Sequence, residues 1–324
     1  MDDKMPDGGS SDERPDSRVE FRLQEGQRVK SESLGLQNLE WLGRGGNGTV
    51  FRMIVTEGSL KGLIVAVKFL EKIQDHERKE RFRKEIETAR RIDHPHVIKI
   101  RDLGNFRARN LEIPFFVMEY QPRNLERDLH AHPGGFHPDL VLPLSLQIAS
   151  ALATLHEEGI IHRDLKPSNI LFDGANVKIA DFGIARSVAG DQDATPTPAG
   201  RKVAPRFHMS PEQWRFWRKK SSERPDKPSD VYQAGLIMYQ TLTGFNPNTV
   251  HKWEDEEGDV AVRQLRNKVG SLANDFVVLV REMLGPEPAS RPSMRQVQDR
   301  LIGIFDSYSS HYSALYGVRP GREF

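Results

Sequence analysis

The residues with the clearest chemical potential lie in one run, HRDLKPSN, at positions 162–169. Within six positions it places a proton acceptor, a cation and an amide: Asp164, Lys166 and Asn169. A second carboxylate, Asp181, follows Asn169 by twelve residues in the triplet Asp-Phe-Gly. Because Mg²⁺ prefers carboxylate and amide oxygens together with phosphate oxygens, Asn169 and Asp181 are the candidate metal ligands. This inventory is what phosphoryl transfer requires, and a coincidental surface turn is the weaker interpretation.

A glycine-rich segment earlier in the chain is the second feature. Gly43, Gly45 and Gly48, followed by Val50, form a GxGxxGxV pattern between two predicted strands. Glycines let backbone amides approach phosphate oxygens because no Cβ stands in the way. A dinucleotide-binding fold would place a helix after this turn, whereas a second strand is predicted here. A flexible hairpin can have the same spacing, so the pattern alone leaves both interpretations open.

Lys68 ends an apolar run and is the candidate cation for nucleotide phosphates. A solvated strand terminus is the alternative interpretation. A partly buried lysine needs an anionic partner, and Glu85 lies beside the apolar face of the next predicted helix. Such a pair would hold the ammonium on the α- and β-phosphates. Glu87 is an alternative partner, but it lies about 200° round the helix from Glu85, so only one of the two can face Lys68.

The elements that must position these residues follow from hydrophobic periodicity. Short apolar or β-branched runs between glycine-bearing turns predict strands, and apolar residues at i, i+4 and i+7 predict helices. The predicted strands cover 39–42, 49–56, 63–70, 97–103 and 113–118, and the predicted helices cover 75–92, 140–155 and 231–242. We therefore expect a small strand-rich N-terminal part and a larger helical C-terminal part.

Composition limits the functional classes. The 324 residues include 47 Lys+Arg and 46 Asp+Glu, and the net charge of +1 does not predict nucleic-acid binding. The longest apolar runs have five residues, far below the roughly 20 of a membrane span. Cysteine is absent, which excludes a thiol nucleophile and Cys-ligated zinc. The N-terminus lacks the pattern of a secretory signal, so a cytoplasmic location is expected. Residues 1–36 are predicted to be a disordered tail, and residues 307–324 a C-terminal tail.

In order and content, these motifs resemble those of eukaryotic-type (Hanks-type) Ser/Thr protein kinases, which bacteria also possess. The resemblance runs from Leu39 to about Ile304. It implies an α+β, bilobal protein kinase fold over residues 37–306. The N-lobe (37–118) is expected to hold an antiparallel β-sheet and one helix, residues 119–122 to form a hinge, and the larger C-lobe (123–306) to be mainly helical.

The resemblance also implies roles for single residues, with ATP and Mg²⁺, or Mn²⁺, as cofactors. Asp164 would be the base toward the substrate hydroxyl, Lys166 would steady the γ-phosphate, and Lys68 would pair with Glu85. Lys166 matches the Ser/Thr version of the loop, so Ser or Thr of protein substrates is the expected acceptor. The implied nucleotide-binding residues are Leu42, Gly43, Gly45, Gly48, Val50, Ala66, Lys68, Met118, Glu119, Gln121 and Leu171.

Three further matches concern structure and regulation. Glu212 in Ser-Pro-Glu resembles the glutamate that pairs with a buried arginine, here Arg291, and Asp230 resembles the aspartate that braces the catalytic loop. Arg163 is a ready receptor for a phosphate group. We expect Thr195 or Thr197 to be phosphorylated in trans by a transient second copy and to dock there. A plain solvated loop and an upstream proline-directed kinase are the alternatives.

Three positions depart from the family. Pro205 stands where Ser/Thr kinases usually carry a threonine, His208 replaces a common tyrosine, and Ser210 replaces alanine. Proline has neither a hydroxyl nor a backbone donor, so it cannot make the contact that the threonine makes with the catalytic Asp and Lys. Unusual substrate docking near the acceptor site is one interpretation, and a gap in the alignment that moves the threonine is the other. A pseudokinase that binds nucleotide without turnover is the main alternative function. A kinase of small molecules is a third, disfavoured because Ser-Pro-Glu and Arg291 serve protein substrates.

Overall fold

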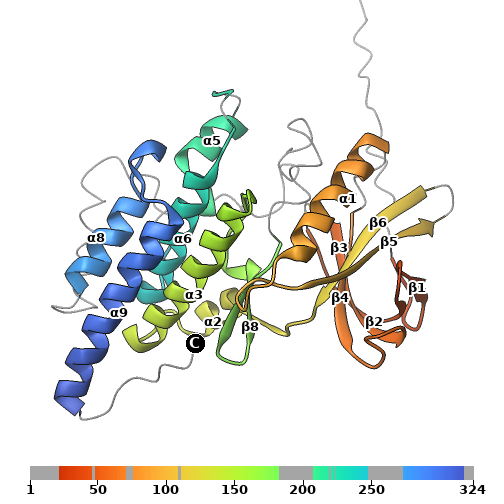
Figure 1. Ribbon diagram of the computed structural model, residues 1–324, viewed down its shortest axis with the longest axis horizontal. Helices are drawn as coiled ribbons and strands as arrows, with labels where there is room; N and C mark the ends of the chain where they lie inside the picture. The colour runs from red at the N-terminus through yellow and green to blue at the C-terminus, as the bar shows by residue number, and fades with distance from the viewer. Residues whose placement is uncertain are drawn as a thin grey trace, which may run out of the picture.

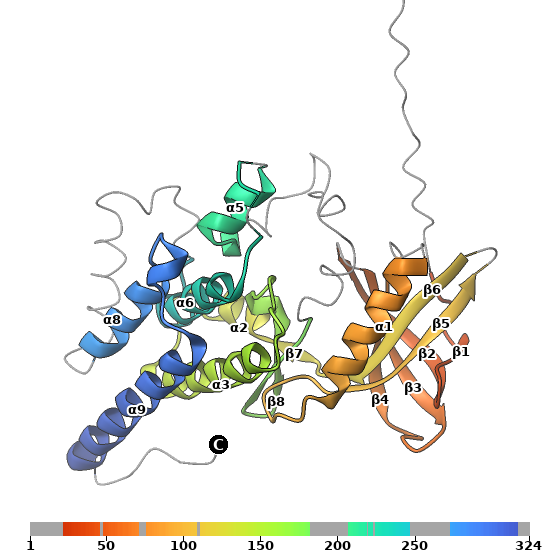
Figure 2. The same ribbon diagram turned by 45° about the horizontal axis from the view of Figure 1, so that its top comes forward.

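The computed structural model describes residues 22–45, 48–70, 76–108, 111–181, 207–218, 220–222, 224–246 and 273–316. A sheet with one helix forms one lobe, and a group of helices forms the other (Figure 1). Turning the molecule leaves the two groups distinct (Figure 2). The N-lobe contains β1 (Arg28–Lys30), β2 (Gly35–Gly45), β3 (Gly48–Glu57), β4 (Ile64–Phe69), α1 (His76–Arg91), β5 (Ile100–Ala108) and β6 (Leu111–Glu119).

The C-lobe begins with a short three-stranded sheet and continues as helices. Its elements are β7 (Arg123–Asn124), α2 (Leu125–Ala131), α3 (Pro138–Glu157), the 3-10 turn η1 (Pro167–Asn169), β8 (Ile170–Asp173), β9 (Asn176–Ile179), α5 (Pro211–Trp217), α6 (Lys227–Thr243), α8 (Ala273–Met283), the 3-10 turn η5 (Pro288–Ser290) and α9 (Met294–Tyr316). The division into a strand-rich and a helical part is confirmed.

The N-lobe sheet has the strand order β1-β2-β3-β4-β6-β5, and all its pairs are antiparallel. One face buries alternate residues such as Phe51, Met53 and Val55 of β3 in a core of their own. Helix α1 packs on the other side, where Phe82, Ile86 and Ala89 are buried as the periodicity predicted. The ring centroid of Phe82 lies 6.3 Å from that of Phe116 on β6. Apolar packing therefore fixes the face that α1 turns to the sheet.

The prediction of a disordered tail over residues 1–36 is wrong for its last part. Residues 28–30 form β1, which pairs antiparallel with β2, and β2 itself starts at Gly35. Leu23, Val29 and Leu34 are buried against the sheet and help to anchor this polar segment. Residues 1–21 lie outside the described residues.

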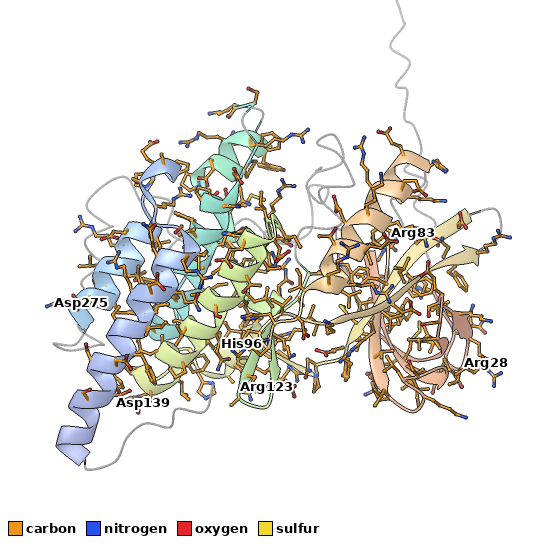
Figure 3. All side chains as sticks on the ribbon, in the orientation of Figure 1. Arg28, Arg83, His96, Arg123, Asp139 and Asp275 are labelled. Atoms are coloured by element: carbon orange, nitrogen blue, oxygen red, sulfur yellow. The ribbon has the colours of Figure 1, made fainter. Side chains whose placement is uncertain are left out.

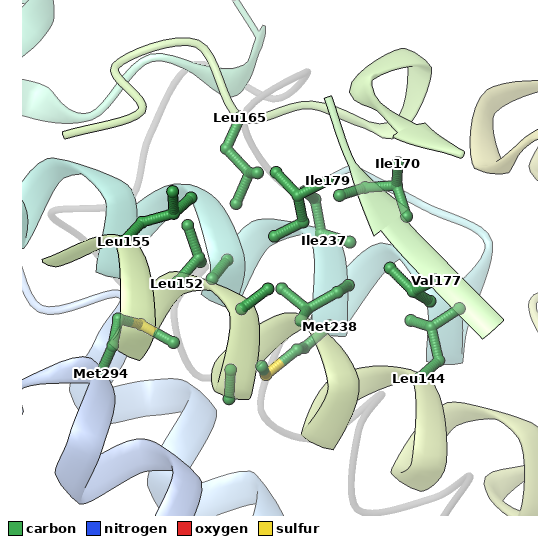
Figure 4. Packing of buried hydrophobic residues seen from close by; sticks show 14 of the residues in the cluster. Leu144, Leu152, Leu155, Leu165, Ile170, Val177, Ile179, Ile237, Met238 and Met294 are labelled. Atoms are coloured by element: carbon green, nitrogen blue, oxygen red, sulfur yellow. The ribbon is translucent and has the colours of Figure 1, made fainter. Parts of the chain in front are cut away.

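The C-lobe is built around α3 and α6, which pack against each other and against β8 and β9 (Figure 4). Leu152 and Leu155 of α3 and Ile237 and Met238 of α6 are fully buried there. Among the described helices, α3 alone is long and apolar enough to cross a membrane, but 56% of its apolar window is buried inside the protein. Its apolar character is therefore explained by its central place in this core.

The final helix is longer than predicted. Helix α9 continues to Tyr316, so residues 307–316 are helical where a tail was expected. The Tyr308 side chain is partly buried, and its hydroxyl donates a hydrogen bond to Asp139 at the start of α3. This hydrogen bond, together with the packing of Tyr308 on the apolar core, ties the start of the extension to α3.

A buried carboxylate on β5 binds the turn between β1 and β2. Asp102 on β5 is 1% exposed, and its Oδ2 accepts hydrogen bonds from Ser31 Oγ (2.6 Å), Ser33 N (2.9 Å) and Ser33 Oγ (2.8 Å). Between these serines, Glu32 pairs with Arg83 at 2.7 Å. Figure 3 shows the position of Arg83 on α1. A Cβ on Gly104 would lie 2.9 Å from Ser31 Cα, so the turn packs directly on the β5 backbone. The turn after β1 thus joins both sheet edges and α1.

Replacing Asp102 should therefore destabilise the N-lobe. We expect Asp102→Ala to lower the free energy of unfolding by about 3 kcal/mol at pH 7, because the buried hydroxyl of Ser31 and the two donors of Ser33, whose hydrogen bonds are partly buried, lose their acceptor. Burial alone would raise the pKa of Asp102, but the hydrogen bonds from Ser31 and Ser33 outweigh it and hold the pKa below its usual value. The carboxylate's contribution is thus complete above the unfolded pKa of about 4 and is lost as the pH falls through the lower folded value.

Urea unfolding of both proteins at pH 7 and at acidic pH measures this effect. Asp173→Ala, at an exposed position in the turn between β8 and β9, is the control and should change stability by less than about 0.5 kcal/mol. Equal unfolding midpoints for Asp102→Ala and wild type at pH 7 would contradict the assignment.

Candidate active site

The glycine-rich hairpin lies between β2 and β3, with Gly43 opposite Val50 and Gly45 opposite Gly48. Gly48 has φ +134°, and a Cβ there would lie 2.0 Å from the Phe69 carbonyl oxygen on β4. Glycine is therefore required at position 48, because the backbone lies so close to β4 that a Cβ would not fit. At Gly43 a Cβ would meet nothing within 4 Å, so the fold itself does not demand glycine there. The space beside Gly43 is therefore open and could admit a phosphate group.

Lys68 and Asp181 are brought together from the two lobes. Lys68 on β4 is 5% exposed, and its ammonium donates a hydrogen bond to the Asp181 carboxylate. Burial alone would raise the pKa of Asp181, but the charge and hydrogen bond of Lys68 outweigh it and hold the pKa below its usual value. The backbone of Asp181 has φ 65°, a conformation uncommon for a non-glycine residue. The carboxylate is therefore ionised and held in a conformation that the surroundings impose.

The predicted pair of Lys68 with Glu85 is not formed. Among the described side chains, the carboxylate that meets Lys68 belongs to Asp181. Glu85 is partly buried on α1, whereas Glu87 is exposed and pairs with Arg83 at 3.3 Å, so the two glutamates lie on different faces of the helix. One buried ammonium needs one carboxylate to balance it, and Asp181 takes that place.

The Asp230 side chain of α6 holds the backbone of the candidate catalytic loop. This carboxylate is fully buried and accepts hydrogen bonds from the backbone N–H groups of His162 and Arg163, both at 2.7 Å. Its Oδ2 also lies 2.8 Å from His156 Nε2. Arg163 has φ 61°, a left-handed conformation that this bonding stabilises. The bracing role predicted for Asp230 is confirmed.

The three residues with chemical potential lie together above this brace. Lys166 Nζ pairs with Asp164 Oδ2 at 3.1 Å, and Asn169 Nδ2 donates to the Asp164 carbonyl at 2.8 Å. The Ala180 N–H donates to the Asn169 carbonyl at 2.9 Å, which places Asn169 beside the residue preceding Asp181. The loop therefore gathers a carboxylate, an ammonium and an amide at the start of β8 and the end of β9.

These residues fit a hard divalent cation. The Asn169 amide nitrogen is used in its hydrogen bond to Asp164, which leaves its side-chain oxygen as the ligating atom. Asp181 contributes an ionised carboxylate. An amide oxygen and a carboxylate are the donors that Mg²⁺ takes alongside phosphate oxygens and water. Asn169 and Asp181 could hold such an ion.

A glutamine that the sequence analysis did not single out connects α5 to this loop. Gln213 Nε2 donates to the Arg163 carbonyl at 3.0 Å, and Gln213 Oε1 accepts from Gln233 Nε2 at 3.1 Å. Gln233 Oε1 in turn accepts from the Leu165 N–H at 3.0 Å. The two carboxamides thus hold the backbone on both sides of Asp164. The one available signal was the position of Gln213, directly after Ser-Pro-Glu.

Comparison with known families agrees with this arrangement. Residues 36–301 match the protein kinase domain. The chain belongs to the protein kinase family. It is 34% identical over 205 residues to a probable serine/threonine-protein kinase of Corynebacterium efficiens, covering 62% of this chain and 30% of that protein. It is also 34% identical over 214 residues to the serine/threonine-protein kinase PrkC of Bacillus subtilis, covering 65% and 31%.

The fold of this kinase is also similar to a solved structure. The kinase domain of Mycobacterium tuberculosis PknI matches with a TM-score of 0.61 and 22% identity, covering 87% of this chain and 99% of that one. The chain spans about a third of the length of the curated relatives it matches.

The predicted adenine-binding residues of the kinase gather at the border of the lobes. Ala66 on β4 pairs with Met118 on β6, and both belong to the main buried cluster. Val50 from the N-lobe and Leu171 from β8 are partly buried against the same cluster. Leu42, by contrast, is 40% exposed. Apolar residues from both lobes are thus brought together, as a flat aromatic base would require.

Glu119, predicted to lie in the hinge, uses its side chain in contacts with its neighbours. The Glu119 side chain pairs with Arg101 of β5 and, at 3.4 Å, with Lys178 of β9. The Lys99 backbone N–H also donates to Glu119 Oε2 at 3.4 Å. Because the side chain is engaged with both lobes, the backbone of Glu119 and Gln121 remains as the part that can meet a nucleotide.

The Ser-Pro-Glu region is fixed as the resemblance implied. Arg291 makes two hydrogen bonds to Glu212, at 2.7 and 2.9 Å, and Ser229 Oγ adds a third at 2.6 Å. Burial would raise the pKa of Glu212, but the bonds from Arg291 and Ser229 outweigh it and lower the pKa. Ser210 replaces the usual alanine because its hydroxyl caps α5 in a reciprocal pair with Gln213.

His208 lies next to the catalytic loop. Its Nε2 is 3.2 Å from Gln240 Oε1 and 3.1 Å from Asn246 Nδ2. Burial lowers the pKa of His208 to about 4, so the ring is neutral near pH 7. The neighbouring departure, Pro205, lies outside the described residues, as do Thr195 and Thr197.

Gln213 should act as a positioning residue. We expect Gln213→Leu to lower kcat by ten- to a hundredfold with little change in the KM for ATP, because Asp164 loses one support of its backbone. Steady-state kinetics with a peptide substrate measures the two constants separately.

Gln298→Leu, on α9, is the matched control and should keep the wild-type kcat. Thermal melting of both variants reports whether they fold. An unchanged kcat in a folded Gln213→Leu protein would contradict this role.

Proposed function

We propose that the chain is an ATP-dependent protein serine/threonine kinase, which transfers the γ-phosphoryl group of ATP to Ser or Thr hydroxyls of proteins. The observation that carries this proposal is the arrangement of Asp164, Lys166 and Asn169 beside the ion pair of Lys68 and Asp181. A nucleotide-binding scaffold would need neither the general base nor its lysine partner. The names of the relatives, all serine/threonine-protein kinases, support the same activity.

Each residue has a definite task in this reaction. Asp164 accepts the proton of the substrate hydroxyl as its oxygen attacks the γ-phosphorus. Lys166, 3.1 Å from Asp164, is placed to balance negative charge on the transferred group. Lys68 holds the α- and β-phosphates from β4, and the glycine hairpin covers them. A magnesium ion held by Asn169 and Asp181 would neutralise phosphate charge.

The present pairing of Lys68 with Asp181 is compatible with this role. Both groups are charged and both bind the phosphates or their metal ion, so they must separate when nucleotide enters. The ion pair of Lys68 and Asp181, without further hydrogen bonds to Lys68 among the described residues, can be exchanged for phosphate contacts. We infer that Lys68 then meets phosphate oxygens, with Glu85 as the glutamate that α1 can bring toward it.

Regulation by phosphorylation is part of the proposal. A phosphate on Thr195 or Thr197 would dock on Arg163, because guanidinium groups bind phosphate in a bidentate manner. Arg163 immediately precedes Asp164 and is anchored by Asp230 and Gln213. A charge bound there would therefore act on the loop that carries the base.

Substitution of the proposed base tests the activity. We expect Asp164→Asn to lower kcat for phosphoryl transfer by about a hundred- to ten-thousandfold, since general-base catalysis contributes 10²- to 10⁴-fold. The Kd for ATP with Mg²⁺, measured by calorimetry, should stay within a few-fold of wild type.

Asp173→Asn, at an exposed position of the same lobe, is the control and should keep full activity. Turnover by Asp164→Asn at the wild-type rate would refute the assigned base. Nucleotide binding without any turnover by the wild type would favour the pseudokinase alternative.

Mass spectrometry after incubation with ATP tests the regulatory part. We expect phosphate on Thr195 or Thr197 in the wild type, and label on an inactive Lys68→Met copy when it is mixed with the wild type, since transfer is in trans. Thr195→Ala/Thr197→Ala should be about tenfold or more less active toward a peptide. A fully active preparation without phosphate on either threonine would contradict this switch.

A further inference from the structure

Helix α5 and the residues after it carry cations that the proposed chemistry does not use. The run WRFWRKK at 214–220 contains four cations and no acid. Arg215, Arg218 and Lys220 are exposed, and none of the three pairs with a carboxylate among the described side chains. The acid next to them in sequence, Glu212, is turned inward to Arg291. Among the described side chains, positive charge without a partner carboxylate is therefore concentrated on α5 and the residues directly after it.

Aromatic rings hold part of this charge in place. The Arg218 guanidinium lies 5.6 Å from the centre of the Trp214 ring. The Trp214 and Trp217 rings are 5.0 Å apart and inclined by 31°. A guanidinium held over an indole keeps its N–H groups available and loses less freedom on binding a carboxylate. We call Trp214, Arg215, Trp217, Arg218 and Lys220 the α5 surface.

The α5 surface stands at a fixed and short distance from the catalytic loop. Gln213, in the first turn of α5, donates to the carbonyl of Arg163, the residue before Asp164. A helix of seven residues is about 10 Å long, and an extended peptide covers about 3.3 Å per residue. Cations on α5 can therefore reach side chains about three to five residues from a hydroxyl placed at Asp164.

We propose that the α5 surface binds acidic residues that flank the acceptor Ser or Thr of a protein substrate. This inference rests on the proposed kinase function and adds a substrate class to it. Charge complementarity selects a carboxylate-rich segment as the occupant. Both indole rings are partly buried and packed on each other, which favours a peptide over a lipid surface, where such rings would extend into the interface.

Peptide kinetics tests the proposal. Two peptides share one serine and differ only in three residues within five positions of it, which are Glu in one peptide and Gln in the other. Each pair is made in two versions, with these residues before or after the serine. The enzymes are wild type, Arg215→Glu/Arg218→Glu, and the control Arg107→Glu/Arg281→Glu, which makes the same charge change at exposed positions on β5 and α8.

For wild type we expect a KM at least about tenfold lower for the Glu peptide than for the Gln peptide in one of the two versions. The difference should be lost in Arg215→Glu/Arg218→Glu and kept in the control. It should also shrink when NaCl is raised from about 50 to 500 mM, because salt screens exposed charges. Thermal melting reports whether both variants fold.

Equal KM values for the Glu and Gln peptides with wild type, or an unchanged preference in the α5 variant, would overturn the proposal. Binding to phosphatidylserine vesicles through Arg215 and Arg218 without any peptide preference would overturn it in favour of a lipid surface. Fluorescence anisotropy of the labelled Glu peptide measures binding independently of turnover. Specific binding without phosphorylation would therefore support the α5 surface while refuting the kinase activity.

Discussion

The carboxylate of Asp230 is the constraint on which the rest of the active site depends. It is fully buried, so its charge must be balanced by hydrogen bonds inside the protein. Two consecutive backbone N–H groups, those of His162 and Arg163, satisfy this requirement. Two amides can converge on one carboxylate only if the backbone turns sharply, which accounts for the left-handed conformation of Arg163. The direction in which Asp164 leaves this turn is therefore set by α6, an element of the core.

The N-lobe is connected to this centre by few contacts. The loop before β5 joins β9 through hydrogen bonds between Ile98 N and Ile179 O and between Ile179 N and His96 O, each 2.9 Å long. Glu119 at the end of β6 pairs with Lys178 of β9, and Lys68 and Asp181 form a further link at the site itself. Buried polar contacts hold the catalytic loop to the C-lobe, whereas one exchangeable ion pair holds the phosphate-binding lysine to it. The lobes can consequently adjust around a nucleotide without disturbing Asp164.

The sequence predicted the bilobal fold and the residues of the catalytic loop because both depend on local patterns: periodicity, glycine-bearing turns and the run HRDLKPSN. It did not predict the partner of Lys68, since the choice between Glu85 and Asp181 depends on how two lobes meet, and these residues are far apart in the chain. It also missed β1 and Gln213. Three buried side chains anchor the polar segment that contains β1, and Gln213 acts through a backbone carbonyl; neither leaves a periodic signal.

Helix α5 shows how tertiary contacts replace intrinsic helix stability. Seven residues are too few for a helix to persist alone in water. Three contacts near its N-terminus stabilise it: Ser210 caps the helix, Glu212 binds Arg291, and Gln213 binds the Arg163 carbonyl. All three contacts lie at the start of the helix, so its first turn is fixed to the catalytic loop. The exposed side chains of the helix remain outside the core. A group bound on that exposed face is therefore held at a fixed position relative to Asp164, and the ordering of the helix is already complete before it binds.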